Sequence, residues 1–266
     1  MATNVIQNVY YDDPHELALD LYPTRGVAKG GVIVIHGGGW FQGDKAKVAG
    51  WATQLAAEGY FAIVPNYRLA PKDPYPAPLE DMARLCDWVK RRELPFDFRH
   101  IAAVGASAGG NLAVELALKY GMPAVSLSGI LTIDDWLDAH QDLAARKGHA
   151  DANDQAASET VNQSGNDDRF YKWFLTNYLP DRADYTPATP AKHVSSHSGP
   201  MYLANSLEEF VPASGVTQLS AALNAHSIPH FTRMLAGSRH GTAYLPDVFD
   251  DTLTFIARCF AERSQS

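Results

Sequence analysis

The chain has 266 residues, of which 46% are hydrophobic, and we expect a single domain because this content can bury one large core. The 30 acidic residues outnumber 22 basic ones, and no block of Lys and Arg offers a surface for nucleic acid. The N-terminus does not resemble a signal peptide and no apolar run has membrane-spanning length, so we expect a soluble, cytoplasmic protein without membrane contact.

Short β-branched runs alternate with segments of helical periodicity through most of the chain. Strand candidates lie at 31–35, 61–64, 101–105, 124–128, 201–204 and 230–234, and helix candidates lie near 46–58, 78–92, 108–120, 213–225 and 246–261. This alternation predicts an α/β fold, in which helices cover both faces of a mostly parallel sheet. Cys86 and Cys259 both fall in helical segments, so we expect two reduced, packed thiols.

The first motif is HGGGW at 36–40, directly after the strand candidate GVIVI. Consecutive glycines are costly on folding, which indicates that bare backbone is needed here. Gly37, Gly38 and Gly39 have no Cβ to block the approach of a ligand to their N–H groups. A phosphate-binding loop is the alternative, but the stretch has neither G-x-G-x-x-G nor a Gly-Lys-Ser/Thr sequence.

The second motif is GASAGG at 105–110, between the strand candidate IAAV and the helical NLAVELALKY. A G-x-S-x-G pattern in a strand, turn, helix context predicts a nucleophilic serine on a sharp turn. Ser107 is that serine, and Gly105 and Gly109 leave room on either side of it.

A nucleophilic serine produces a tetrahedral oxyanion, which needs hydrogen-bond donors already aimed at it. We expect the N–H of Ala108, the residue after the nucleophile, to converge on this oxygen with those of Gly37 and Gly38.

A polar stretch from 138 to 168 interrupts the alternation, and an aromatic cluster follows at 170–179. A long segment without clear elements inside a compact domain is typical of a functional lid or a mobile loop. A disordered insertion is the alternative for the polar part, whereas the aromatic part must pack on something.

The general base should be a histidine that follows the nucleophile and the acid in the chain, the order found on α/β-hydrolase sheets. His240 fits, because it lies in the small-residue loop AGSRHGTAY between the last strand candidate and the last helix candidate. His36 precedes the nucleophile. His193 and His197 have a zinc-like spacing, but no Glu lies between them, so we expect no metal.

The third member of the triad should be a carboxylate after the strand candidate MYLA, to orient the imidazole and stabilise its charged form. Glu208 and Glu209 both follow that strand, in NSLEEFVPAS. The residues alone leave the choice between them open.

Several motifs together resemble one family, namely HGGGW, NYRLAP at 66–71, YPAPLEDMARLCDWV at 75–89, GASAGG and GSRHG. They are similar to the α/β-hydrolase carboxylesterases related to hormone-sensitive lipase and to bacterial feruloyl and acetyl esterases. The resemblance implies hydrolysis of small-molecule esters through an acyl-enzyme, without cofactor or metal. In that family the acid commonly lies in a D-x-x-V/I-P pattern, which falls on Glu208, and a Glu in place of the commoner Asp is a departure. The motif around Arg68 implies an ion pair with Glu80 or Asp81.

The family's cap follows the sixth core strand, a place that residues 134–180 occupy in this chain. We expect the aromatic residues there and beside the two motifs to wall the substrate pocket, although those of the cap have the alternative role of anchoring it to the core. The candidates for the pocket are Trp40, Trp136, Trp173 and Tyr244, with Phe170, Tyr171, Phe174 and Tyr178 as further cap aromatics.

Two other functions remain open at this point. Kynurenine formamidase shares an H-G-G-x-W motif and a Ser-Asp-His triad, but the esterase-like sequence around NYRLAP favours an esterase. A ligand-binding protein on the same fold, as the plant gibberellin receptor is, usually lacks a triad member, whereas Ser107, His240 and an acid are all present here. A homodimer through an edge strand or the last helix is also left open.

Overall fold

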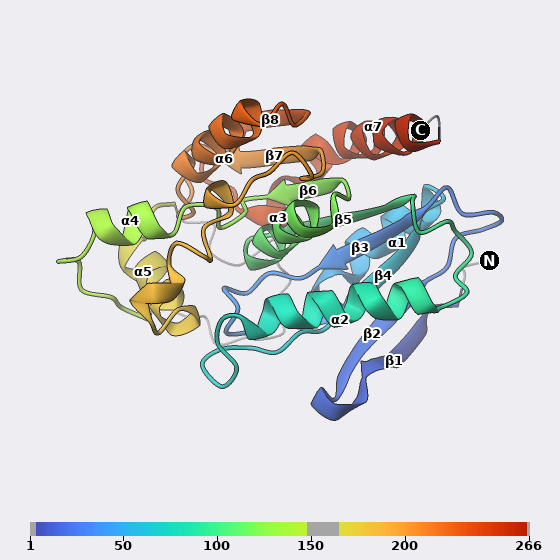
Figure 1. The fold of residues 1–266 in the computed structure, drawn as a ribbon, viewed down its shortest axis with the longest axis horizontal. Coiled ribbons are helices and arrows are strands. Elements are labelled where there is room, and N and C mark those ends of the chain that lie inside the picture. Colours follow the sequence, from blue (N-terminus) through green and yellow to red (C-terminus); the bar gives the residue numbers. More distant parts are fainter. Residues whose placement is uncertain (1–3, 148–164, 265–266) are drawn as a thin grey trace.

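An eight-stranded sheet runs through the part of the chain that the structure describes, residues 4–147 and 165–264 of a computed structural model. Its order is β1-β2-β4-β3-β5-β6-β7-β8 (Figure 1). The strands are β1 (Ile6–Asp12), β2 (Leu17–Tyr22), β3 (Gly31–Ile35), β4 (Phe61–Pro65), β5 (Ile101–Ala106), β6 (Ala124–Leu127), β7 (Met201–Ser206) and β8 (His230–Leu235). From β4 through β8 all neighbours are parallel, while β1 and β2 add an antiparallel edge.

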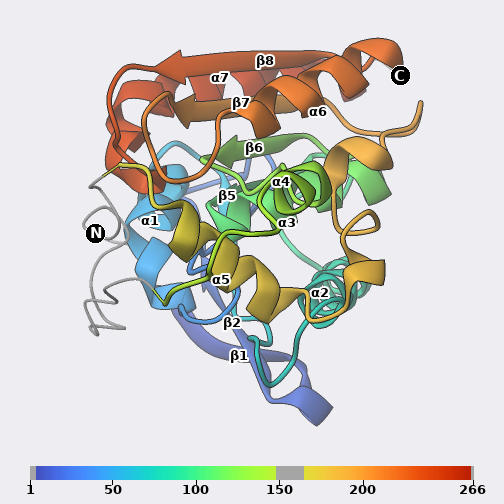
Figure 2. The ribbon, with the colours of Figure 1, turned by 90° about the vertical axis from the view of Figure 1, so that its left-hand side faces the viewer.

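Helices cover both faces of this sheet, so the prediction of a mostly parallel α/β fold is confirmed (Figure 2). One face carries α2 (Ala77–Arg91), α3 (Ala108–Tyr120) and α6 (Ser214–Ala225), and the other carries α1 (Ala49–Ala57) and α7 (Leu245–Arg263). Strand residues alternate between the two cores: Ile33 and Ile35 pack with the first group, and Val32 and Val34 with the second. This alternation explains why β3 is apolar throughout, since a strand buried on both faces has no solvent side.

The sequence patterns missed the two N-terminal strands. β1 is mostly exposed and β2 contains Asp20, so neither shows the apolar run of a buried strand. Asp20 is buried, and its carboxylate has two partners: Lys45 Nζ lies 2.9 Å from it and the Asn8 N–H donates to it at 2.9 Å. A buried charge is tolerated when it is paired and hydrogen-bonded in this way.

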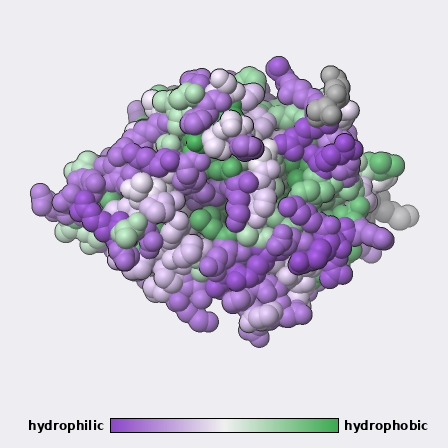
Figure 3. Space-filling view, in the orientation of Figure 1, coloured by the Kyte–Doolittle hydropathy of each residue, from purple (hydrophilic) through white to green (hydrophobic). Residues whose placement is uncertain are grey.

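The segment after β6 contributes two helices, α4 (Asp134–Ala139) and α5 (Asp168–Tyr178). Both lie beyond the carboxyl ends of the parallel strands, with α5 in front of the sheet in Figure 2. Most of the polar stretch expected to be a lid or a mobile loop lies outside the described residues, which end at 147 and resume at 165. The face of the molecule in Figure 3 is mainly hydrophilic, with small hydrophobic areas. Within the described ranges, no helix combines the length and apolar character of a membrane span.

Candidate active site

Ser107 lies between β5 and α3, on a turn that has the predicted geometry. Its φ of 57° and ψ of −124° place it in a strained region that few non-glycine residues adopt. The turn is held by a hydrogen bond from the Ser107 N–H to the Leu127 carbonyl oxygen, at 2.9 Å. A Cβ on Gly109 would lie 2.2 Å from the Ile35 carbonyl oxygen, so the helix packs this closely on β3 only with glycine there. Strain of this kind at a surface cavity indicates a functional position.

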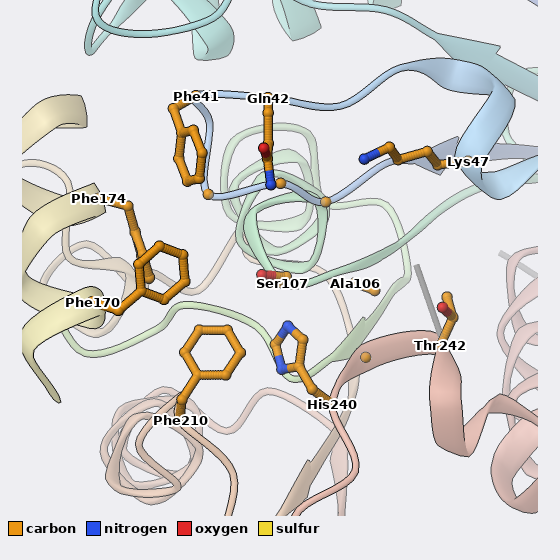
Figure 4. A pocket seen from close by; sticks show the side chains of 14 residues that line it. Phe41, Gln42, Lys47, Ala106, Ser107, Phe170, Phe174, Phe210, His240 and Thr242 are labelled. Carbon is orange, nitrogen blue, oxygen red and sulfur yellow. The ribbon is translucent and has the colours of Figure 1, made fainter. Parts of the chain in front are cut away.

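His240 lies at the end of the loop after β8, and its side chain faces Ser107 across a cavity (Figure 4). Its Nδ1 contacts the carboxylate of Glu209, with Oε2 as the partner atom. Both side chains are buried. A carboxylate accepts and never donates when ionised, so Nδ1 carries the proton and Nε2 is the unprotonated nitrogen that can act as a base.

The choice of Glu208 as the partner of His240 is wrong. β7 ends at Ser206, and the following turn exposes Leu207 and Glu208 to solvent before Glu209 points inward. The Glu208 N–H donates to the Gly237 carbonyl oxygen at 3.0 Å, which holds this turn against the loop after β8. The turn geometry, which the family pattern did not specify, therefore brings the second glutamate to the histidine.

The other oxygen of Glu209 is held by a buried network that the sequence analysis missed. Ser128 Oγ donates to Glu209 Oε1 at 2.8 Å, and the Ser206 N–H donates to the same oxygen at 2.8 Å. Ser128 Oγ also accepts from the Gly241 N–H, at 2.8 Å, and lies 2.8 Å from the Tyr244 hydroxyl, which donates to the Ala204 carbonyl oxygen. Ser128 directly follows β6, at the carboxyl edge of the sheet where ligands of such folds bind. Its position after a predicted strand could therefore have identified it from the sequence as a residue of the site.

Tyr244 is therefore a support of the acid and does not wall the pocket as expected. Its side chain is fully buried, and its hydroxyl lies 2.9 Å from the Ala204 carbonyl oxygen as well as beside Ser128.

The HGGGW loop runs past Ser107, where Gly37 and Gly38 line the same cavity. Gly38 has a φ of 121°, and a Cβ on it would lie 1.9 Å from the Gln42 carbonyl oxygen, so only glycine fits this turn. In the described part of the chain, the N–H groups of Gly38 and Ala108 donate no hydrogen bond to protein. Ala108 is buried at the start of α3, next to Ser107. These are the donors that the oxyanion prediction requires.

His36 orients this loop through a hydrogen bond to the Gly37 carbonyl oxygen. Its Nδ1 lies 2.8 Å from the Gly37 carbonyl oxygen, which can only accept, so Nδ1 carries the proton. In a trans peptide the C=O and the next N–H point in opposite directions, so turning the Gly37 carbonyl toward His36 turns the Gly38 N–H away from it. Complete burial lowers the pKa of His36 to about 4, despite the opposing effect of the bond to Gly37, and the ring is neutral near pH 7.

Four phenylalanines form the apolar wall of the cavity, in place of the expected tryptophans. Phe170 and Phe174 come from α5, Phe210 follows the acid, and Phe41 follows the HGGGW motif (Figure 4). Phe210 also packs on the imidazole of His240, with 4.4 Å between ring centroids. Phe170 and Phe174 were among the expected cap aromatics, whereas Phe41 and Phe210 were not identified from the sequence.

None of the three tryptophans proposed for the pocket lines this cavity. Trp40 is fully buried and stacks on Tyr178 of α5 at 4.0 Å, so it anchors α5 to the HGGGW loop. Trp136 stacks on His140 at 4.1 Å, and Trp173 meets Phe41 edge-on at 4.9 Å. Trp173 and Tyr178 thus contact rings outside residues 134–180, in keeping with the anchoring role considered for them, whereas Trp136 stacks on a ring within that segment.

The expected ion pair of Arg68 is present with both candidate partners. Its guanidinium lies 2.7 Å from Asp81 Oδ1 and 2.9 Å from Glu80 Oε2. Asp81 is completely buried at the start of α2 and is also held by Arg84 Nη1 at 3.0 Å. The pair fixes the NYRLAP loop on α2, away from the cavity lining.

A family model for the alpha/beta hydrolase fold matches residues 32–240. The chain belongs to this family. The match spans both glycine motifs and ends on His240, so it contains Ser107, Glu209 and His240.

Among curated proteins, the putative acetyl-hydrolase LipR of Mycobacterium tuberculosis is 33% identical over 129 residues, which are 47% of this chain and 41% of that protein. Esterase LipI of the same organism is 42% identical over 92 residues, which are 33% of this chain and 28% of that protein. The matched segments thus span less than half of these relatives. Among solved structures, an esterase of Pyrobaculum calidifontis superposes with a TM-score of 0.74 at 19% identity, over 100% of this chain and 86% of that one, and shows the same fold.

Proposed function

We propose that the protein is a serine carboxylesterase that hydrolyses small carboxylic esters through an acyl-enzyme intermediate. One observation carries the proposal: Ser107 on its strained turn, the histidine of the His240–Glu209 pair and the glycine loop all border one cavity. A nucleophile, a base oriented by a carboxylate and free N–H donors are the parts that acyl transfer requires. The names of LipR and LipI, as an acetyl-hydrolase and an esterase, support the same reaction class.

The reaction proceeds in two similar halves. His240 Nε2 takes the Ser107 hydroxyl proton while Oγ attacks the ester carbonyl carbon, and Glu209 stabilises the imidazolium. The N–H groups of Gly38 and Ala108, with that of Gly37, hold the oxyanion. When the tetrahedral intermediate collapses, the ester C–O bond breaks and His240 returns its proton to the leaving alcohol. Water then attacks the acyl-enzyme by the same steps and releases the acid.

The dimensions of the cavity favour a short acyl group. Its volume is about 50 Å³, which is room for roughly four water molecules at about 10–15 Å³ each. The bulky rings of Phe170, Phe174 and Phe210 close its apolar side. We therefore expect acetyl to butanoyl esters to react faster than longer ones.

Initial rates on p-nitrophenyl esters from acetyl to decanoyl test this proposal, with N-formylkynurenine as a formamide comparator. The expected result is hydrolysis that peaks at short chains, is lost in Ser107→Ala and persists in Ser196→Ala, an exposed serine away from the cavity. Activity that survives in Ser107→Ala would overturn the mechanism. A preference for the formamide would replace the ester with a different substrate class.

The domain organisation and the location of the protein remain predictions. We propose that residues 134–180 form the cap of a single domain, since α4 and α5 lie over the carboxyl ends of the strands and Phe170 and Phe174 close the cavity. A cytoplasmic location is proposed as well, in keeping with two buried cysteines that form no disulfide.

We also propose a homodimer through β8. This strand is an edge of the sheet, and four of its six residues are exposed, among them Phe231 and Met234. Exposed edges with apolar side chains pair readily with another strand. A dimer mass in light scattering that becomes monomeric in Phe231→Lys supports the proposal, and a monomeric native protein overturns it.

A further inference from the structure

The cavity beside Ser107 has two chemically different walls. The phenylalanines lie on one side of Ser107 in Figure 4, and Lys47 and Thr242 lie on the other, with the Gln42 amide reaching toward the serine between them. The apolar wall suits a hydrocarbon group, but the proposed reaction itself uses none of the three polar side chains. Their presence therefore needs a separate explanation.

Lys47 carries a positive charge that nothing in the described chain neutralises. It lies in the turn that precedes α1 (3-10 helix Lys45–Val48), and Figure 4 shows its ammonium group directed into the cavity. Among the described residues, its side chain has no ion pair and no hydrogen bond, whereas Lys45 in the same turn pairs with Asp20 at 2.9 Å. A half-buried ammonium without a partner favours the binding of an anion.

Thr242 also has a polar side-chain atom without a partner among the described residues. Its Oγ1 is buried and has no hydrogen-bond partner among the described residues. Buried hydroxyl groups are almost always paired in folded proteins, so an unpaired one at a cavity wall indicates a group that a ligand satisfies.

Glu209, the acid beside His240, cannot take the place of that ligand. Both oxygens of Glu209 are committed, one to His240 and the other to Ser128 and the Ser206 N–H. The polar wall is thus left with one cation and two neutral hydrogen-bonding groups, which suits a single carboxylate. A phosphate group carries up to two charges and usually takes arginines or several backbone N–H groups.

We propose that the substrate ester carries a carboxylate on its alcohol side, bound by Lys47 with Gln42 and Thr242, while the acyl group lies against the phenylalanines. The alcohol is assigned to the polar wall because its oxygen takes a proton from His240, and Thr242 follows His240 by two residues. This inference rests on the proposed esterase function. It makes Lys47 a residue that determines specificity without taking part in bond breaking.

Two matched pairs of substrates test it, in which a carboxylate is replaced by a carboxamide of the same shape. The first pair is 3-acetoxypropanoate and 3-acetoxypropanamide, with the group on the alcohol side. The second pair is monomethyl succinate and methyl succinamate, with the group on the acyl side. For each pair, kcat/KM is measured by pH-stat and expressed as the acid-to-amide ratio.

The native protein should give a ratio above one for the alcohol-side pair, and Lys47→Gln should lower that ratio by about tenfold, chiefly through KM, as expected for the loss of one charge-assisted hydrogen bond. Lys47→Arg should retain most of the preference, which separates charge from packing. Lys72→Gln makes the same change of net charge at an exposed site outside the cavity and should leave the ratio unchanged.

A native ratio of one or below, or a ratio that Lys47→Gln does not change, overturns the inference. A change confined to the acyl-side pair overturns the assignment to the alcohol. If p-nitrophenyl acetate is hydrolysed in a Ser107-dependent way without any carboxylate preference, only this inference fails. If no ester is hydrolysed in that way, the proposed function fails, and this inference fails with it.

Discussion

The Glu209 carboxylate contacts His240 Nδ1 with one oxygen and accepts two hydrogen bonds on the other, so the acid is held on both sides. Glu208, its neighbour in the chain, points into solvent. A fixed, buried carboxylate keeps the imidazole in the tautomer whose unprotonated Nε2 can accept the Ser107 proton. The two adjacent glutamates therefore form a matched pair for mutation.

Glu209→Gln should lower kcat by about 10³-fold or more, because a neutral amide neither selects the tautomer nor stabilises the imidazolium. Glu208→Gln should change kcat less than about twofold, as a surface substitution away from the cavity. Steady-state kinetics on p-nitrophenyl acetate measures both. The opposite order would restore Glu208 as the acid.

Ser128→Ala should impair both activity and stability. It removes a hydrogen bond to Glu209 and leaves the buried Gly241 N–H without its acceptor, while the Tyr244 hydroxyl keeps the Ala204 carbonyl oxygen. We expect kcat to fall by about tenfold and the free energy of unfolding to fall by about 2 kcal/mol, the usual cost of buried polar groups left unpaired. Urea unfolding and kinetics check the two effects, with Ser196→Ala as the exposed control. Unchanged kcat would mean that Ser128 does not position the acid.

His36 should make the native state less stable at acidic pH. Burial lowers its pKa from 6.5 to about 4, so between these pH values His36 is mostly protonated in the unfolded chain and mostly neutral in the native chain. Stability from this residue is thus lost as pH falls from about 6.5 toward 4, amounting to about 2 kcal/mol between pH 7 and pH 5.

Urea unfolding at the two pH values measures this loss, comparing the native protein with His36→Asn, whose amide can still donate to the Gly37 carbonyl. The native protein should lose about 2 kcal/mol more than the variant on going from pH 7 to pH 5. His197→Asn, at an exposed loop position, should behave like the native protein. Equal losses in all three proteins would show that His36 is protonated equally in both states.

Arg68→Met should destabilise the fold without changing the lining of the cavity. It leaves the fully buried Asp81 with only Arg84 as a charged partner, and breaking one side of a buried pair costs about 3 kcal/mol. Arg258→Met breaks the exposed pair with Glu262 and should have little effect on the unfolding midpoint. If Arg68→Met unfolds at the same midpoint as the native protein, the ion pair contributes no stability.

The sequence by itself determined the features that depend on local sterics and on chain order. The strand before Ser107, the helix after it and the flanking glycines predict the sharp turn at Ser107, because only small residues let a strand turn so sharply into a helix. The parallel core sheet from β3 to β8 also followed from periodicity, and the resemblance to the family implied that Arg68 pairs with Glu80 or Asp81. The N-terminal strands did not, because an exposed strand and a strand with a buried ion pair lack the apolar run that marks a buried strand.

Only the tertiary structure decided which neighbouring side chains reach the site. Glu208 and Glu209 carry the same charge, and a turn after β7, held by a backbone bond to Gly237, points one outward and the other toward His240. In the same way, α5 presents Phe170 and Phe174 to the cavity, while Trp173 of that helix packs against Phe41. A family pattern names the type of residue, but the direction of a side chain depends on contacts between segments far apart in the chain.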